Sequence, residues 1–307
     1  MVRDGNTHFP APLNEFRYFP GELNIPTRII LIDGSGNITL DALDWLSEQG
    51  VHLIRFRWNG EITNLSIPSG YSANLENVHW QLNSQANCKA RLEFASEIIS
   101  RKIAASLLNL ESQFPASDAT ERAIRFAKSA INVLTNPRRR NLSALLGLEG
   151  KAAAFYFEAW RQIPINWKST SRHPIPDEWR NFTSRSNLSK DPKNYAATHP
   201  VNAMLNYAYK VLETNIRIHC AIEGYDPHIG ILHTGKRNKF SNEPSFVLDL
   251  MEPYRPVIDR EIIKIIKKEK LSGADFNIQR NGVCRLNPEM ARYLVQKATI
   301  PRLQFPH

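Results

Sequence analysis

Ionisable side chains stand among apolar residues in two segments of this 307-residue chain. The first segment, residues 141–163, reads NLSALLGLEGKAAAFYFEAWRQI, and its three- and four-residue apolar spacing predicts a helix. Glu149 follows Leu145 by four positions and precedes Ala152 by three, which places its carboxylate on or beside the buried face. A buried carboxylate is costly unless a cation accompanies it. The sequence therefore predicts either a metal ligand or a partner for a basic side chain of the core.

The second segment, residues 229–253, contains a histidine and two further acids. His233 ends an apolar run and precedes a glycine turn, while Asp249 and Glu252 stand three positions apart among apolar residues. Residues with this spacing share one side of a helical turn, where two like charges repel each other. A divalent cation would neutralise them, and mixed imidazole and carboxylate ligation suits Mn²⁺ or Mg²⁺ better than a structural zinc. Pairing with cations of the core is the structural alternative.

The charge of the chain is unevenly distributed. Five arginines stand against nine acidic residues in residues 1–80, a net −4, whereas the whole chain carries +9, so the remainder carries +13. Such a basic remainder is suited to contacts with a phosphate backbone, and a solvated surface without a partner is the alternative. The basic residues next to the two segments are the predicted DNA contacts: Arg138, Arg139, Arg140, Lys236, Arg237 and Lys239.

A small β-rich region precedes these segments. Residues 28–32 form a β-branched run that ends at a glycine-rich turn, residues 41–50 have helical spacing, and residues 51–58 alternate up to Asn59-Gly60, a hairpin signature. The first 25 residues are expected to add edge strands. We therefore expect residues 1–65 to form an N-terminal β-rich domain and residues 66–77 to be a linker.

The remaining residues, 78–307, are expected to form a helical domain. Its predicted helices cover residues 78–111, 118–134, 141–163, 198–223 and 256–270, with an extended stretch at 164–197. The apolar runs are too short to span a bilayer, and the N-terminus lacks the apolar stretch of a signal peptide. Three widely spaced cysteines form neither a disulfide framework nor a metal knuckle. These features predict a cytoplasmic protein with reduced thiols and no membrane partner.

Three motifs resemble one known family. The stretches GLEGKAAAFYFEAW, HPVNAMLNYAYKVLE and ILHTGKRNKFSNEPSFVLDLMEPYRPVIDR closely resemble the CRISPR-associated spacer-acquisition integrase, the first of the two Cas adaptation proteins. The resemblance runs from about Ile29 to about Leu294. It implies an α+β fold, with a small N-terminal β-sandwich-like domain that forms a homodimer and a larger all-α catalytic domain that binds DNA.

The resemblance also implies the roles of the ionisable residues. Glu149, His233 and Glu252 would be the ligands of Mg²⁺ or Mn²⁺, and Asp249 would complete the catalytic set. Glu252 stands where many members of the family have Asp, so this chain uses the longer acid. Supporting positions are implied at Asn202 and Tyr207.

The implied reaction is metal-dependent endonuclease and integrase chemistry in CRISPR adaptation. The 3′-OH ends of short double-stranded DNA, the new spacers of antiviral defence, would be joined to a target duplex such as a CRISPR array by transesterification. The second Cas adaptation protein would be the partner. Two alternatives stay open: a casposase-type or stand-alone transposon integrase with the same catalytic domain, and a non-catalytic DNA-binding scaffold.

Overall fold

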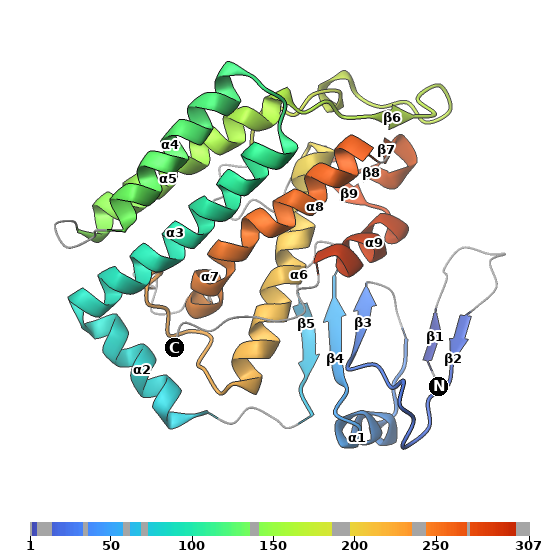
Figure 1. Ribbon diagram of the computed structural model, residues 1–307. Coiled ribbons are helices and arrows are strands. Elements are labelled where there is room, and N and C mark those ends of the chain that lie inside the picture. Colours follow the sequence, from blue (N-terminus) through green and yellow to red (C-terminus); the bar gives the residue numbers. More distant parts are fainter. Residues whose placement is uncertain are drawn as a thin grey trace. The chain divides into compact units, whose positions relative to one another are not determined.

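The chain folds into two compact units, Met1–Ser72 and Ala73–His307 (Figure 1). The computed structural model describes residues 2–4, 14–32, 36–57, 62–68, 73–135, 141–185, 197–234, 244–268 and 271–298. The boundary between the units falls inside the stretch 66–77 that the sequence analysis treats as a linker. The first helix after the boundary begins at Leu75, because Asn74 accepts hydrogen bonds from the amides of Glu76 and Asn77 and caps it.

The N-terminal unit contains two small sheets among its described residues. β1 (Val2–Asp4) and β2 (Asn14–Phe16) pair with each other, and the three-stranded sheet has the order β3 (Arg28–Ile32), β4 (His52–Phe56), β5 (Ile62–Ser66). The helix α1 (Leu40–Glu48) connects β3 to its parallel neighbour β4. β4 and β5 are antiparallel, which confirms the predicted hairpin. The strands of the first 25 residues form their own sheet, so the prediction that they extend an edge was wrong.

The larger unit is mainly helical, as predicted. Its helices are α2 (Leu75–Ala86), α3 (Cys88–Gln113), α4 (Asp118–Leu134), α5 (Leu142–Ala159), α6 (Pro200–Ile222), α7 (Ser245–Met251), α8 (Arg255–Lys268) and α9 (Pro288–Ala298), with short 3-10 helices η2 (Trp160–Gln162), η3 (Asp177–Trp179), η4 (Glu252–Tyr254) and η5 (Gly273–Asp275). The single helix predicted over 78–111 is two helices. Asn87 has extended backbone and caps α3 through its side chain, which ends α2.

The expected larger helical domain also contains two short two-stranded sheets, so its described residues are mainly rather than purely helical. β6 (Trp167–Lys168) pairs in parallel with β7 (Leu271–Ser272), and β8 (Phe276–Ile278) pairs antiparallel with β9 (Cys284–Leu286). The stretch predicted as extended is packed over its described part. Trp167 stacks on Trp179 with ring centroids 5.9 Å apart, and both rings contact Phe276 edge-on. These aromatic side chains therefore stabilise the fold rather than standing free for a ligand.

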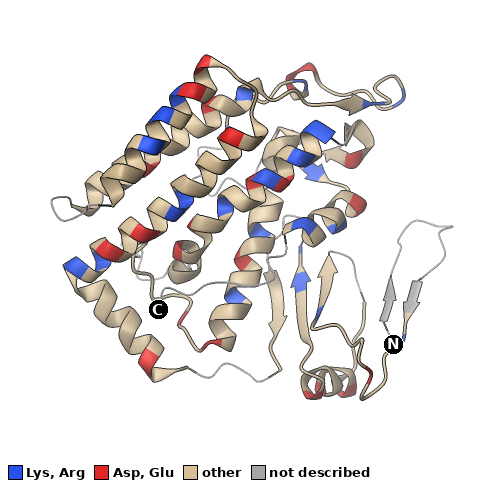
Figure 2. Ribbon diagram, viewed as in Figure 1, with Lys and Arg blue, Asp and Glu red and all other residues tan. Residues whose placement is uncertain are grey.

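The long helix α3 occupies the centre of the larger unit. It packs against α4, α5, α8 and η4, while α6 packs against α7, α8 and α9 (Figure 1). Bands of Lys and Arg lie along α3, α4 and α8 (Figure 2). None of the helices in the described ranges has the length and apolar content that crossing a membrane requires. The packing of α5 and η4 on α3 brings together the segments that carry Glu149 and Glu252.

Candidate active site

Glu149 and Glu252 meet at one basic side chain. Glu149 projects from α5, Glu252 begins η4, and Lys102 lies on α3 between them. The Lys102 ammonium donates to Glu252 Oε2 at 2.6 Å and to Glu149 Oε1. The exposed fractions of the three side chains are 18% for Lys102, 24% for Glu149 and 12% for Glu252. Two of the three predicted ligands therefore converge on a shared cation inside the protein.

Arg255 binds the other oxygen of Glu252. Its Nε donates to Glu252 Oε1 at 3.0 Å, one helical turn further along the chain. Burial by itself would raise the pKa of Glu252, but the charges of Arg255 and Lys102 lower that pKa to about 2. For Lys102, burial would lower the pKa, and the charges of Glu252 and Glu149 raise it above its ordinary value. The carboxylate is thus ionised and the ammonium is protonated at neutral pH.

Asp249 holds the loop that carries His233. Its carboxylate is fully buried and accepts the backbone N–H groups of Ile231 at 2.6 Å, Leu232 at 2.9 Å and His233 at 2.8 Å. The same carboxylate lies 2.7 Å from the imidazole Nδ1 of His233. Both oxygens of Asp249 are therefore directed at the loop and the imidazole, so this acid positions His233.

His233 presents its second ring nitrogen away from Asp249. A carboxylate only accepts hydrogen bonds, so Nδ1 carries the proton and Nε2 of the neutral ring keeps its lone pair. Burial would lower the pKa of His233, but the hydrogen bond and charge of Asp249, together with the charge of Glu252, raise it. Of the two glutamates, Glu252 is the one whose charge contributes to this shift.

Side chains of α2 and α3 hold the same loop through its carbonyl groups. Gln81 donates to the carbonyls of Asp226 and Ile229, and Gln85 donates to that of Gly230. Arg91 donates to the Ile231 carbonyl at 2.8 Å and to Thr234 Oγ1 at 3.0 Å. No motif in the sequence points to these residues. Polar Gln81 and Gln85 at helical i,i+4 spacing were the available signal.

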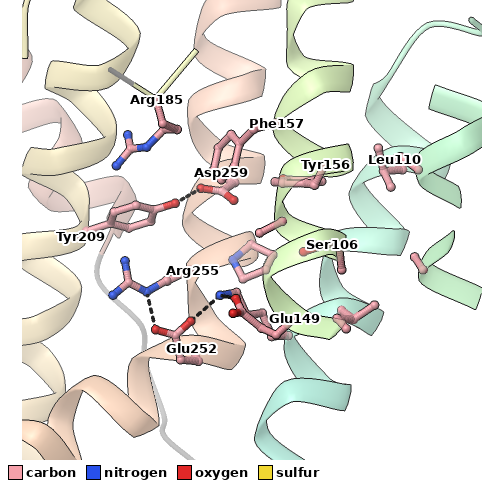
Figure 3. Close-up of a pocket in the computed structure, with 17 residues that line it drawn as sticks. Ser106, Leu110, Glu149, Tyr156, Phe157, Arg185, Tyr209, Glu252, Arg255 and Asp259 are labelled. Carbon is pink, nitrogen blue, oxygen red and sulfur yellow. Dashed lines mark hydrogen bonds and ion pairs between the residues drawn. The ribbon is translucent and has the colours of Figure 1, made fainter. Parts of the chain in front are cut away.

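A cavity of about 300 Å³ lies beside the carboxylates (Figure 3). It is lined at one end by Glu149 and Glu252, and at the other by Arg185, Tyr209 and Asp259. The Tyr209 hydroxyl donates to the fully buried Asp259 carboxylate, an interaction drawn as a dashed line in Figure 3. Burial raises the pKa of Asp259 to about 6, against the lowering effects of Tyr209 and Arg185. Sequence patterns did not reveal this polar end of the cavity.

The two predicted supporting residues lie elsewhere in the same region. Asn202 donates to the Ser184 carbonyl at 2.9 Å and accepts from Arg185 at 3.3 Å, so it helps to position a residue of the cavity wall. Tyr207 is buried, and the tyrosine of α6 that lines the cavity is Tyr209. The predicted DNA contacts, Arg138, Arg139, Arg140, Lys236, Arg237 and Lys239, lie outside the residues that the structure describes.

The donor set can be tested against a divalent cation. Over the described ranges, no three side chains of His, Cys, Asp or Glu are grouped closely enough to hold a metal ion in the arrangement seen. The Lys102 ammonium instead takes one oxygen from each glutamate. Two carboxylates that converge on a cation are oxygen donors of the kind that Mg²⁺ and Mn²⁺ take, and in this structure the Lys102 ammonium lies between them.

Relatives and solved structures share this architecture. The chain is 29% identical over 288 residues to the CRISPR-associated endonuclease Cas1 1 of Archaeoglobus fulgidus, covering 89% of this chain and 77% of the relative. A casposase bound to integration product has a TM-score of 0.74 and 25% identity, with 96% of this chain and 76% of the other covered. A chain of a Cas6-RT-Cas1–Cas2 complex has the same fold, with a TM-score of 0.65, 20% identity, and coverage of 89% and 28%.

The family resemblance of the three motifs is confirmed at the level of the whole chain. A sequence model of the family described as CRISPR associated protein Cas1 matches residues 25–299. That span includes Glu149, His233 and Glu252, and it also includes Lys102 and Asp249. The chain therefore belongs to the Cas1 family of CRISPR-associated proteins.

Proposed function

We propose that this protein is a metal-dependent DNA endonuclease and integrase of CRISPR adaptation. The observation that carries the proposal is the convergence of Glu149 and Glu252 on the partly buried Lys102 ammonium, together with the hydrogen bond by which Asp249 holds the imidazole of His233. The named relative from Archaeoglobus fulgidus is an endonuclease, and the casposase is bound to integration product. Family membership and the arrangement of these side chains support the same reaction.

The proposed reaction is transesterification at phosphorus. The 3′-hydroxyl oxygen of a short DNA attacks a phosphodiester of the target, a new P–O bond forms, and the P–O3′ bond of the target breaks. The proton of the attacking hydroxyl leaves to solvent or to a nearby base, and the departing target oxygen takes up a proton. Water in place of the 3′-hydroxyl gives hydrolysis, so one site supports both nuclease and strand-transfer activity.

The residues of the site would have separate roles in metal binding, positioning and charge stabilisation. Glu149, Glu252 and Nε2 of His233 would hold Mg²⁺ or Mn²⁺, which when bound polarises the scissile phosphate and favours the attacking alkoxide. Asp249 keeps the Nδ1 proton of His233 in place and thereby aims Nε2. Arg255 keeps Glu252 ionised. Arg185 and Arg255 line the cavity together with Glu149 and Glu252, and they would supply positive charge to an anionic phosphate bound there.

The proposal includes partners and a cellular location. Double-stranded DNA with 3′-OH ends and a target duplex are the proposed substrates. Two copies of this chain would form a homodimer that binds the second Cas adaptation protein. The proposed location of this assembly is the cytoplasm. One chain of similar fold belongs to a Cas6-RT-Cas1–Cas2 complex, which supports Cas2 as that partner.

An integration assay tests the reaction. A duplex with 3′-OH ends and a supercoiled plasmid are incubated with Mn²⁺, with and without Cas2. Glu149→Ala or His233→Ala is expected to reduce strand transfer by at least about a hundredfold, because the charge stabilisation at phosphorus is lost. DNA binding in a gel-shift assay is expected to stay near that of the unmodified protein.

Glu158→Ala is the matched control, since Glu158 lies on the same helix and its side chain is 40% exposed. Wild-type strand transfer in Glu149→Ala would contradict the assignment. Target choice separates CRISPR adaptation from the transposon alternative, which the family match over residues 25–299 does not favour. Preference for a plasmid that carries a CRISPR array supports adaptation, whereas equal use of plasmids with and without an array supports a stand-alone integrase.

A further inference from the structure

Lys102 occupies the position where a metal ion would neutralise the two glutamates. Its Nζ lies 2.6 Å from Glu252 Oε2 and also donates to Glu149 Oε1. The side chain is only 18% exposed, and no acid from its own helix pairs with it in the interactions described. The ammonium is thus held by carboxylates from two other elements, α5 and η4.

The position of the Lys102 ammonium between the two carboxylates stabilises the metal-free protein. Two carboxylates that face one point in a partly buried site repel each other and lose hydration, which destabilises the folded state. One ammonium between them offsets part of both costs. Arg255 donates its Nε to the other oxygen of Glu252, and among the interactions of the described residues it is Lys102 that bonds to both glutamates.

The Lys102 ammonium and a divalent ion cannot both occupy the position between the two carboxylates. Both would need the same oxygens of Glu149 and Glu252, and a doubly charged ion about 4 Å from an ammonium is repelled strongly at low dielectric. The cavity of about 300 Å³ offers space for the displaced ammonium, because Lys102 and Ser106, one turn apart on α3, both line it. Its flexible four-carbon stem allows that movement.

We propose that Lys102 is a built-in counter-ion that holds Glu149 and Glu252 together in the metal-free protein and gives way when the divalent ion binds. The inference rests on the proposed function, because it takes the metal ligands from there. The ammonium and the divalent ion compete for the two carboxylates. The apparent affinity for the metal therefore depends on the ligands and on the fraction of molecules in which Lys102 has moved away from Glu149 and Glu252. Lys102 is a positioning residue, and its effect is on metal binding before any DNA is present.

Metal binding in the absence of DNA tests the proposal. Mn²⁺ is titrated by calorimetry into the full-length protein and into Lys102→Met, Lys102→Gln and Lys102→Arg. Removing the charge in Met or Gln is expected to tighten Mn²⁺ binding by at least about tenfold, since the competitor is gone. Lys102→Arg keeps the charge and is expected to bind Mn²⁺ about as the unmodified protein does. General damage to the site would weaken binding, so the direction of the change separates the two explanations.

Thermal denaturation gives a second readout. Without metal, Lys102→Met and Lys102→Gln are expected to unfold at lower temperature than the unmodified protein, and Mn²⁺ is expected to raise their Tm by more. Lys102→Gln retains a hydrogen-bond donor, which protects the experiment against a Met variant that fails to fold. Lys128→Met is the matched control, because Lys128 is 58% exposed and pairs with Glu111 on the surface.

The outcomes distinguish this inference from the proposed function. If the unmodified protein binds no Mn²⁺, or if Glu149→Gln and Glu252→Gln leave binding unchanged, the proposed metal site fails. If the unmodified protein binds Mn²⁺ through these glutamates but folded Lys102→Gln binds it equally or more weakly, the counter-ion role of Lys102 is overturned. Tighter binding with a lower metal-free Tm supports it.

Discussion

Asp249 is the residue on which the local order of the site depends. Its buried carboxylate accepts three backbone N–H groups and contacts the imidazole of His233. A carboxylate has enough lone pairs for all four interactions, whereas an amide side chain has one acceptor oxygen and an NH₂ group that only donates. The acid is therefore needed for its geometry as well as for its charge.

Asp249→Asn is expected to lower the free energy of unfolding by about 3 kcal/mol, because buried N–H groups are left without an acceptor. It is also expected to reduce strand transfer by roughly 10- to 100-fold, since His233 is no longer aimed. Urea denaturation and the integration assay measure the two effects. Asp177→Asn serves as the control, since the side chain of Asp177 is 93% exposed. Unchanged stability in Asp249→Asn would show that the fold does not depend on the hydrogen bonds from the His233 loop to this carboxylate.

At the scale of elements, the site depends on how closely the His233 loop approaches α7. A Cβ added at Gly230 would lie 2.5 Å from the His233 carbonyl oxygen and 2.7 Å from Ser245 Cβ. The Gly230 N–H also donates to Ser245 Oγ at 3.2 Å. Only a residue without a side chain allows this contact, so glycine sets the distance between the loop and the helix that carries Asp249.

Gly230→Ala is expected to destabilise the protein by about 2 kcal/mol, because backbone atoms must move apart. Strand transfer is expected to fall with it, as the loop that carries His233 shifts. Gly147→Ala is the opposite case: Gly147 lies within α5 and nothing approaches its would-be Cβ within 4 Å. That change is expected to stabilise the helix by about 0.5–1 kcal/mol. Urea denaturation measures the free energy of unfolding of both variants. Equal changes in the two variants would contradict the close contact that is inferred at Gly230.

At the scale of the whole molecule, charges are buried deep in the larger unit. Asp259 lines the cavity at the end opposite the two glutamates and accepts a hydrogen bond from Tyr209. The titratable groups that interact with it electrostatically include Tyr156, Arg185 and Arg255. The guanidinium of Arg255 also lies 5.0 Å from the centre of the Tyr209 ring. Stability should therefore depend on pH through this carboxyl group.

The sign follows from the raised pKa. Burial raises the pKa of Asp259 from 3.8 to about 6, so the folded state holds this proton more tightly than the unfolded chain does. The contribution to stability is complete below about pH 4 and is lost as pH rises through about 6. The unfolding free energy of the unmodified protein is expected to fall relative to that of Asp259→Asn over this interval. Urea denaturation between pH 4 and pH 7.5 measures it, and parallel curves would contradict the buried titration.

Much of this protein could be predicted from the sequence. Helical and alternating periodicity located most elements, and the start of α4 is fixed locally, because the Ser117 hydroxyl accepts the Thr120 amide at 3.2 Å. These features are local, because propensity, capping and turn chemistry act over a few residues. The family motifs were also readable, since they are runs of neighbouring residues. The sequence thus determined the elements, the family and the types of side chain available for chemistry.

Only the tertiary structure decided which of those side chains meet. Lys102 stands on a face of α3 that looks unremarkable in sequence, yet it joins Glu149 and Glu252 from two distant elements. Packing also decided that the carboxylate of Asp249 is directed at the His233 loop and imidazole, and that the α6 tyrosine lining the cavity is Tyr209. The physical reason is that charge pairing and burial depend on helix packing, and periodicity specifies a buried face without naming the residue opposite it.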